Sequence, residues 1–282
     1  MSRHRLALVL GSGGVRSVAA LGIVDALARH GIRPDLVVGC SSGALFGAVI
    51  ASGMAPAEGL ALSRKLWSQE LTERHNRRAW LQLLMPRLAR FNADFALRDS
   101  SLIGQRIESV FGTRRIEALP LALRIATTDA SSGEPVLLSR GALAPALRAS
   151  MAVPLVFPPV HIDGQRLIDG VASDPLPVAA ALDASVVLTL GFAGRPPRRI
   201  DRPSRLVAHV STMTLNNLMR ARLDAAAARG QRIVPFELAL DRHVGLWQTD
   251  ALPELFEAGQ RAARARLCEV ETLLRHDPRA AT

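Results

Sequence analysis

The sequence lacks tyrosine altogether, and aromatic residues make up only 4% of its 282 residues. It therefore shows no belt of aromatic side chains of the kind that integral membrane proteins place at the bilayer surface. Its uninterrupted apolar stretches are also far shorter than the roughly 20 residues that span a bilayer. We therefore expect any contact with a membrane to be peripheral.

Cysteine is nearly absent as well, because the sequence contains only Cys40 and Cys268. Two residues are too few for a disulfide framework, and they lack the spacing of metal ligands. We therefore expect a cytoplasmic location, no metal and no cofactor. The apolar stretch at residues 6–10 stops at Gly11 and is too short for the apolar part of a secretory signal, so we interpret it as a buried strand.

Negative charge is in the minority, since 35 Lys and Arg residues against 25 Asp and Glu residues give a formal net charge of +10. Such an excess suits an anionic partner, either nucleic acid or a membrane that contains acidic lipids. The sequence carries no nucleic-acid-binding motif, so we do not expect a nucleic-acid partner. Ordinary solvated surface is the alternative interpretation of the charge, because nearly every cation is arginine and arginine usage also follows the base composition of a genome.

Strand, turn and helix follow one another twice in the first 51 residues. An apolar stretch at residues 6–10 leads through a glycine loop into helical spacing at residues 18–29. The same order returns with a strand at residues 35–38 and a helix at residues 44–51. This order predicts parallel strands that are covered by helices.

The later part of the chain carries further strand signals. Residues 159–168 alternate apolar and polar side chains around Asp163 and Gly164, which is the strongest short-range signal for a β-hairpin. We expect further strands at residues 121–126, 135–139, 185–190 and 232–236, and a helix at residues 141–150. The pattern and the length predict one α/β domain over residues 1–282, a three-layer α/β/α sandwich with a mostly parallel central sheet.

A basic, amphipathic segment extends over residues 55–98 and is interrupted by Pro56 and Pro86. Its cations are Arg64, Lys65, Arg74, Arg77, Arg78, Arg87 and Arg90, and its large apolar residues include Trp67, Trp80, Leu83, Leu84 and Met85. One interpretation is a pair of helices that cover the core and expose a solvated face. The other is a lid or a membrane-contact surface near the functional site.

The motif with the most chemical content is Gly39-Cys40-Ser41-Ser42-Gly43, a G-x-S-x-G pentapeptide. A serine on a sharp turn between a strand and a helix needs neighbours without side chains, and this pentapeptide lies between a predicted strand and a predicted helix. Ser41 would face unpaired N–H groups at the start of that helix, which favour a developing negative charge. Ser41 is therefore the candidate nucleophile. The alternatives are a serine that only caps the helix and a nucleophilic Cys40, whose position instead predicts burial.

The glycine loop Gly11-Ser12-Gly13-Gly14 offers successive backbone N–H groups that could hold an oxyanion. A dinucleotide-binding fingerprint would need glycine where Arg16 stands, and the Gly-Lys-Ser/Thr ending of a phosphate-binding P-loop is absent. A glycine turn that merely connects strand and helix is the alternative.

A serine nucleophile needs a base. The seven histidines are His4, His30, His75, His161, His209, His243 and His276. None lies in a distinctive motif, although Asp169 followed by His209 or His243 has the chain order of a serine–acid–histidine triad. Asp169 follows an apolar pair at the end of a predicted strand, where desolvation raises the pKa of a carboxyl group above about 3.9, toward a value useful for accepting a proton. Asp163 is assigned to the hairpin turn.

In this combination and order, the motifs resemble the bacterial patatin-like phospholipase family. The glycine loop with Arg16 resembles the oxyanion loop of that family, and the pentapeptide at residues 39–43 resembles its nucleophile elbow. Asp169-Gly170-Val171 resembles the D-G-[GA] block that carries the base. Further family-like segments are residues 126–129, 132–135, 149–154, 157–159 and 175–177, so the resemblance covers roughly residues 5–265.

The resemblance implies a hydrolase of fatty-acyl esters, such as phospholipids or lysophospholipids, that works through a Ser-Asp dyad without histidine. Ser41 would attack the acyl carbonyl group and Asp169 would accept its proton. The loop from Gly11 to Gly14, above all the amides of Gly13 and Gly14, would then hold the oxyanion, with the charge of Arg16 nearby.

Three residues depart from the family pattern. Ser17 stands where the family usually closes its loop with glycine, Val171 replaces a small residue, and Asp174 occupies a position that is commonly asparagine. We expect Val171 to narrow the site and Asp174 to shift the pKa of Asp169. A histidine-triad esterase and a catalytically silent relative are the alternative functions.

Overall fold

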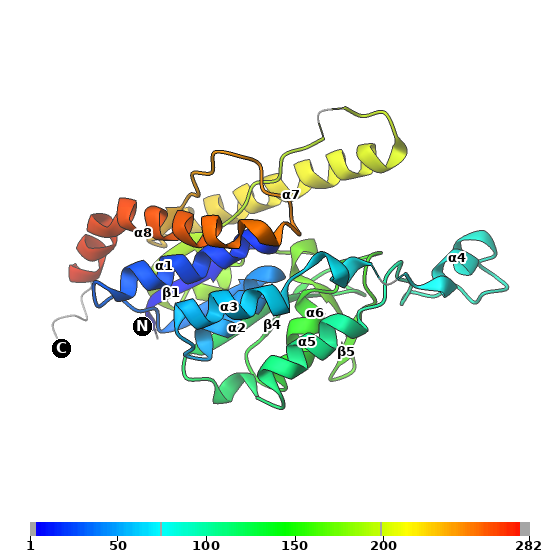
Figure 1. Cartoon of the computed structure of the whole chain (residues 1–282), viewed down its shortest axis with the longest axis horizontal. Coiled ribbons are helices and arrows are strands. Elements are labelled where there is room, and N and C mark those ends of the chain that lie inside the picture. The colour runs from blue at the N-terminus through cyan, green and yellow to red at the C-terminus, as the bar shows by residue number, and fades with distance from the viewer. Residues whose placement is uncertain (1–3, 74, 198, 277–282) are drawn as a thin grey trace.

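The computed structural model describes residues 4–73, 75–197 and 199–276, which form an α/β fold (Figure 1). The strands are β1 (His4–Leu10), β2 (Leu36–Cys40), β3 (Ala122–Asp129), β4 (Pro135–Leu138), β5 (Val160–Ile162), β6 (Gln165–Asp169), β7 (Ala184–Leu190) and β8 (Ile233–Phe236). The α-helices are α1 (Ala19–Ala28), α2 (Ser42–Ala51), α3 (Pro56–Leu66), α4 (Arg77–Leu84), α5 (Ser101–Phe111), α6 (Leu143–Ser150), α7 (Pro203–Ala228) and α8 (Leu252–Arg275). The predicted strand positions are confirmed to within a few residues.

The centre of the sheet is parallel and one edge is antiparallel. The strand order is β5-β6-β3-β2-β1-β7-β8, and β4 pairs with β3 off this path. β1 lies parallel between β2 and β7, and the pairs β2–β3 and β7–β8 are parallel too. The antiparallel pairs are β3–β4, β3–β6 and β5–β6. The prediction of a mostly parallel sheet is therefore confirmed.

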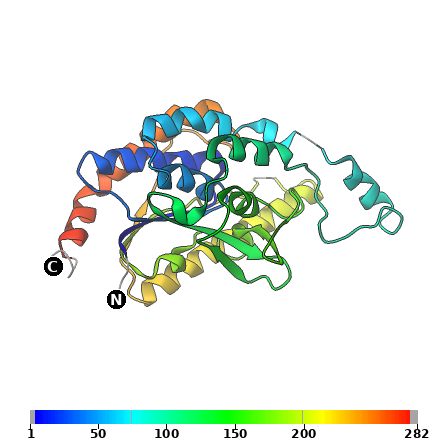
Figure 2. The ribbon, with the colours of Figure 1, turned by 90° about the horizontal axis from the view of Figure 1, so that it is seen from below.

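Helices cover both faces of the sheet, which gives three layers (Figure 2). Successive residues of β1 belong to different cores, as the alternation of side chains along a strand requires. Leu8 and Leu10 belong to the core under α1, α2 and α8, whereas Ala7 and Val9 belong to the core under α7 and the 3-10 helix η5 (Val178–Ala181). Because the side chains of β1 are buried on both faces of the sheet, its sequence is a continuous apolar stretch.

Strand β3 brings two strand ends together. At Ala126, β3 pairs with Cys40 of β2 on one edge and with Leu137 of β4 on the other. One residue later, Thr127 still pairs with β4, but its other partner is Asp169 of β6. Because β4 occupies the opposite edge at both positions, β2 and β6 share one edge of β3 and run toward each other. The residue that follows Cys40 is thereby placed next to Asp169.

The predicted hairpin is confirmed in β5 and β6. Its two turn residues, Asp163 and Gly164, have φ angles of 49° and 78°. Two positive φ angles in succession match the twist of antiparallel strands, and Asp-Gly tolerates them at little cost. The turn thus fixes the register of β6, whose last residue is Asp169.

The basic segment divides into two parts with different surroundings. Helix α3 packs on the body of the protein through buried residues, as a covering helix does. Residues 75–98, which we call the arm, extend away from the body and carry α4 (Figure 1). A bridge between His75 and Arg98 closes the base of the arm. The prediction of a covering helix pair is therefore confirmed for α3 and wrong for α4, and Arg74 lies outside the described residues.

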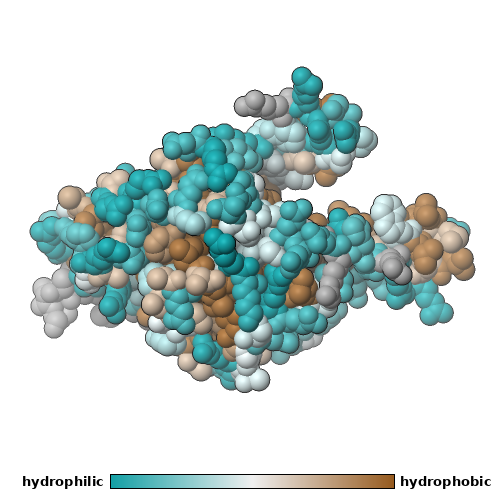
Figure 3. Space-filling view, viewed as in Figure 1, coloured by the Kyte–Doolittle hydropathy of each residue, from teal (hydrophilic) through white to brown (hydrophobic). Residues whose placement is uncertain are grey.

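Large apolar side chains lie in solvent on the arm (Figure 3). Their exposed fractions run from 46% to 77%, and they are Trp80, Leu81, Leu83, Leu84, Met85, Leu88 and Phe91. Arg78 and Arg87 are exposed among them. In the described part of the chain, no helix is both long enough and apolar enough to cross a membrane.

Candidate active site

The backbone turns sharply at Ser41, between β2 and α2. Ser41 has a φ of 56° and a ψ of −124°, a strained conformation for a residue with a side chain. A Cβ atom on Gly39 would lie 2.4 Å from the Cα of Ala44, and one on Gly43 would lie 2.4 Å from the carbonyl oxygen of Leu10. Both positions therefore require glycine, and the geometry is that of a nucleophile elbow.

Ser41 and Asp169 are in direct contact. The Ser41 hydroxyl group donates a 2.7 Å hydrogen bond to Oδ2 of Asp169, across a separation of 128 residues in the chain. Ser41 is 7% exposed and Asp169 is completely buried. A hydroxyl group and a buried carboxyl group at this distance have the geometry of a nucleophile and its base.

Burial controls the chemistry of Asp169. It raises the pKa of the carboxyl group from 3.8 to about 7, because the charged form loses its hydration. Three hydrogen bonds to the carboxylate oppose part of this rise in pKa. Oδ1 accepts one from the Val171 amide at 2.9 Å and a weak one from the Cys40 thiol at 3.8 Å. Oδ2 accepts the third from the Ser41 hydroxyl group. The result is a carboxylate that can accept a proton near neutral pH.

Ser150, at the end of α6, holds the elbow in place. Its hydroxyl oxygen accepts a 2.8 Å hydrogen bond from the Ser41 amide, and its hydroxyl group donates one of 2.7 Å to the carbonyl oxygen of Ala126. The sequence analysis assigned no role to Ser150. The available signal was its place in the family-like segment at residues 149–154.

The amides of the glycine loop are mostly occupied. The N–H groups of Gly11 and Ser12 donate to the carbonyl oxygens of Leu190 and Pro175. The N–H group of Gly13 donates to the Ser42 hydroxyl oxygen at 3.1 Å. In this conformation the amides of Gly11, Ser12 and Gly13 therefore have acceptors, and the oxyanion role of the loop stays a prediction.

Two other amides beside the dyad are differently placed. Within the described part of the chain, the N–H groups of Gly14 and Ser42 have no hydrogen-bond acceptor. Ser42 is the first residue of α2, where unpaired amides and the helix dipole favour negative charge. Both amides are therefore available to stabilise an anion in this conformation.

A comparison with known families agrees with this geometry. The model of the family described as patatin-like phospholipase matches residues 8–182, which include the glycine loop, Ser41 and Asp169. The chain belongs to the patatin-like phospholipase family. An uncharacterised NTE family protein of Mycobacterium tuberculosis is 34% identical over 235 residues, which cover 81% of this chain and 60% of that protein.

One further relative and one solved structure extend the comparison. Patatin-like phospholipase domain-containing protein 7 of Rattus norvegicus is 32% identical over 199 residues, which cover 69% of this chain and 14% of that protein. The solved structure of human GIVD cytosolic phospholipase A2 with a fluorophosphonate inhibitor has a TM-score of 0.50 at 12% identity, covering 96% of this chain and 59% of that one. This likeness concerns the fold. The chain spans about half to three fifths of the length of its mycobacterial relatives.

The departures from the patatin-like pattern have definite places in the structure. The hydroxyl group of Ser17 lies 2.9 Å from that of Ser42, so a hydroxyl pair links the loop to the elbow. Asp174 is buried 3.9 Å from Arg222, and burial raises its pKa to about 6. The raised pKa of Asp169 is traced to its own burial, so the expected effect of Asp174 on it is not found.

The remaining residues of the two motifs surround the dyad. Gly170 approaches Ala126 so closely that a Cβ atom would lie 2.6 Å from its carbonyl oxygen, and the half-buried Val171 follows it. Cys40 is buried, and burial together with Asp169 and Asp174 raises the pKa of its thiol, which makes it a poor nucleophile. None of the seven histidines hydrogen-bonds Ser41 or Asp169 among the described residues.

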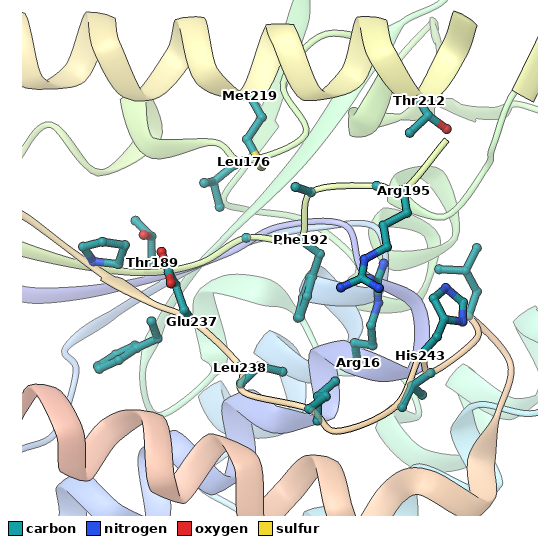
Figure 4. A pocket seen from close by; sticks show the side chains of 18 of the residues that line it. Arg16, Leu176, Thr189, Phe192, Arg195, Thr212, Met219, Glu237, Leu238 and His243 are labelled. Atoms are coloured by element: carbon teal, nitrogen blue, oxygen red, sulfur yellow. The ribbon is translucent and has the colours of Figure 1, made fainter. Parts of the chain in front are cut away.

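A cavity of about 720 Å³ opens beside the patatin-like site, at the carboxyl ends of β7 and β8 (Figure 4). Arg16 and Phe192 line it, but Ser41 and Asp169 do not. The Arg16 guanidinium group stacks 4.9 Å from the centre of the Phe192 ring, and its Nε donates to the Gly13 carbonyl oxygen at 3.0 Å. The glycine loop thus forms a partition between the cavity and the elbow. No group of three or more metal-ligating side chains is found within the described ranges.

Proposed function

We propose that this protein is a serine hydrolase of lipid acyl esters that works through a dyad of Ser41 and Asp169. The observation that carries the proposal is the 2.7 Å hydrogen bond between the Ser41 hydroxyl group and Asp169, whose pKa burial raises to about 7. Membership in the patatin-like phospholipase family supports the same chemistry.

The proposed reaction has two steps. Ser41 Oγ attacks the acyl carbonyl carbon while Asp169 accepts the hydroxyl proton, and the tetrahedral intermediate collapses as Asp169 returns the proton to the departing alcohol. Water then attacks the acyl-enzyme, Asp169 again takes and returns a proton, and the fatty acid leaves with Ser41 restored. Asp169 is suited to both directions of transfer because its pKa lies near neutral pH.

We assign the oxyanion to the amides of Gly14 and Ser42. Both N–H groups lack an acceptor among the described residues, and Ser42 adds the positive end of the α2 dipole. Gly13 can join them if its amide leaves the Ser42 hydroxyl oxygen, at the cost of one hydrogen bond.

The exposed surface of the arm indicates the class of substrate. The arm presents a row of exposed apolar side chains together with arginines, a combination that suits the boundary between lipid and water in an anionic membrane. We therefore infer that the protein acts on phospholipids, lysophospholipids or related acyl esters at a membrane surface, which the arm contacts from outside.

A set of variants tests the dyad. Purified wild type, Ser41→Ala, Asp169→Asn and a His209→Ala/His243→Ala double variant are assayed on p-nitrophenyl acyl esters of graded chain length, with folding checked by circular dichroism. The proposal expects loss of turnover in the first two variants and its retention in the third. Loss in the histidine variant as well would favour the triad, and an inactive wild type on a broad panel of acyl esters would favour a silent relative.

A further inference from the structure

Helix α7 extends well beyond the sheet that it covers. It connects the parallel strands β7 and β8, so it runs back antiparallel to them and begins beyond their carboxyl ends (Figure 1). Its 26 residues span about 39 Å, whereas the 7 residues of β7 span about 23 Å. Ala226, near the other end, is the only residue of α7 that is fully buried, and the structure describes all of this helix. Residues 203–213, which we call the overhang, therefore have little of the protein beneath them.

One face of α7 changes from apolar to polar along the helix. Leu206, Val210 and Met213 are spaced by four and three residues, so they form one row on its surface. Their exposed fractions are 49%, 53% and 48%. The row continues at the same spacing with exposed polar side chains, which are Asn217, Arg220 and Asp224. A solvated helix face is ordinarily polar, as the second half of this row is, so the apolar first half indicates a surface that contacts something apolar.

Cations gather where the overhang begins. Among the described residues of 195–205, Asp201 is the one acid, and the cations are Arg195, Arg199, Arg202 and Arg205. Apolar side chains beside an excess of cations are the combination by which an amphipathic helix binds a membrane that contains acidic lipids. A stable interface with another protein takes about 20 residues a side, which the short apolar row does not provide. The surface therefore suits an anionic membrane better than a second protein.

The overhang lies at the edge of the sheet that carries the dyad. Strands β1, β2 and β7 are parallel, so their carboxyl ends share one edge, and Ser41 directly follows the last residue of β2. The arm projects toward the same side of the molecule as the overhang (Figure 1). A membrane that touches both surfaces therefore faces the edge of the sheet at which Ser41 lies.

We propose that the overhang binds the surface of an anionic membrane, as a second contact beside the arm. Leu206, Val210 and Met213 enter the boundary between lipid and water, and the arginines before them lie against the negative surface. Two contacts on separate elements fix the orientation of the protein on the membrane, and together they bind more strongly than either alone. The role of this orientation in catalysis rests on the proposed function, whereas the binding itself does not.

Vesicle binding by two matched leucine variants tests the apolar row. Leu206 and Leu182 are both 49% exposed, but Leu182 lies just before β7, at the opposite edge of the sheet. Leu206→Ser and Leu182→Ser, each combined with Ser41→Ala so that no lipid is consumed by the proposed route, are sedimented with vesicles of phosphatidylcholine and phosphatidylglycerol. We expect Leu206→Ser to raise the lipid concentration for half-maximal binding by roughly fivefold or more, and Leu182→Ser to leave it unchanged. Equal effects in the two variants, or none in either, would overturn the proposal.

A matched pair of arginine variants tests the cations. Arg202 and Arg229 flank the two ends of α7. Arg202→Gln should weaken binding to the phosphatidylglycerol vesicles by roughly threefold, and Arg229→Gln should not. The loss in Arg202→Gln should shrink at high salt and in vesicles of phosphatidylcholine alone. A loss of the same size in neutral vesicles would contradict the assignment of these cations to an anionic surface.

Two comparisons separate this inference from its rivals. Sedimentation velocity without lipid should give the same mass for wild type and Leu206→Ser, and a wild-type dimer that dissociates in Leu206→Ser would assign the overhang to a second copy of the chain and overturn the proposal. Vesicle binding that depends on Leu206, in a protein whose wild type hydrolyses no acyl ester, would support this inference and remove the proposed function. Ester hydrolysis that depends on Ser41, with vesicle binding that ignores Leu206, would leave the proposed function standing and remove this inference alone.

Discussion

The hydroxyl oxygen of Ser150 accepts the backbone N–H group of Ser41, and this bond ties the strained nucleophile elbow to the end of α6. Ser150 also donates to the carbonyl oxygen of Ala126 in β3. One buried side chain thus satisfies the Ser41 amide at the sharp turn and bonds a carbonyl group of the neighbouring strand β3. The strain at Ser41 is held by a residue 109 positions away in the chain.

Replacement of Ser150 by alanine tests this support. The Ser150→Ala variant leaves the buried amide of Ser41 unpaired, so we expect a loss of about 1–3 kcal/mol in the free energy of unfolding. Displacement of the nucleophile should also lower kcat by roughly tenfold or more. Urea denaturation and ester hydrolysis measure the two effects. The control is Ser63→Ala, which removes a buried serine of α3 bonded to Gly59 and should lower stability without changing kcat.

The activity should depend on pH through Asp169. The base must be ionised to accept the Ser41 proton, and burial raises its pKa to about 7. We therefore expect kcat/KM for a neutral ester to rise with pH and to reach half its limit near pH 7. The Asp174→Asn variant should keep this midpoint, because the raised pKa of Asp169 comes from its own burial. A midpoint near pH 4 would show that burial does not raise the pKa of the group that accepts the proton.

The contribution of Asp169 to the free energy of unfolding should fall as pH rises, whereas the activity should increase. The pKa of Asp169 is about 7 in the folded protein and about 3.9 in an unfolded chain, so the folded state binds more protons between these values. Its contribution to stability is therefore present below about pH 4 and is lost as pH rises to 7. We expect Asp169→Asn to be more stable than wild type at pH 8, by on the order of 4 kcal/mol at most, and this difference to shrink to about 1 kcal/mol at pH 4.5. Denaturation at both values measures the difference, and a variant less stable at pH 8 would contradict the burial of an ionised carboxylate.

The contact between Gly13 and Phe192 predicts that a second substitution, at Phe192, restores activity lost in Gly13→Ala. An alanine at position 13 would place its Cβ atom 2.1 Å from the Phe192 ring. Gly13→Ala should therefore displace the loop or the ring and lower kcat by roughly tenfold or more. The Gly13→Ala/Phe192→Ala double variant removes the collision and should recover a large part of the loss. If ester hydrolysis does not recover in the double variant, the lower activity of Gly13→Ala comes from a change in the loop amides and not from the collision with Phe192.

The arm should bind anionic membranes through Trp80. Trp80 is 58% exposed, whereas Trp67 is buried and stacks on Trp247 at 4.6 Å, so a change in tryptophan emission on lipid addition reports mainly on the arm. We expect a blue shift with vesicles that contain anionic phospholipid, weakened by high salt and lost in Trp80→Phe. A Leu84→Ser/Leu88→Ser variant should bind vesicles more weakly at unchanged hydrolysis of soluble esters. Binding that ignores salt, vesicle charge and these substitutions would exclude the arm as the contact.

The sequence predicted those features that depend on local pattern. The Asp163-Gly164 turn, the buried strands and the elbow around Ser41 each leave a signature within about ten residues. The bond from Ser41 to Ser150 was missed because it joins residues far apart in the chain and leaves no periodicity. The projecting α4 was missed for a related reason: apolar spacing predicts a helix with an apolar face, but not which surface that face contacts.

The glycine loop shows a further limit of prediction from sequence patterns. The sequence identifies Gly13 as an amide free of steric hindrance, but not the acceptor that this amide finds. Its present acceptor, the hydroxyl group of Ser42, is linked to Ser17, a residue that departs from the family pattern. The availability of an amide depends on the neighbouring side chains, which only the folded structure brings together.

The carboxyl ends of β2 and β6 point toward each other on one edge of β3, and this arrangement affects how the chain folds. Ser41 is placed by contacts among the first three strands, whereas Asp169 reaches it only when β6 docks on β3. Pairing of segments so far apart in sequence is slow, because the loop between them must first close. During refolding, recovery of ester hydrolysis should therefore lag behind recovery of helical circular dichroism, because the proposed catalysis requires the pairing of β6 with β3.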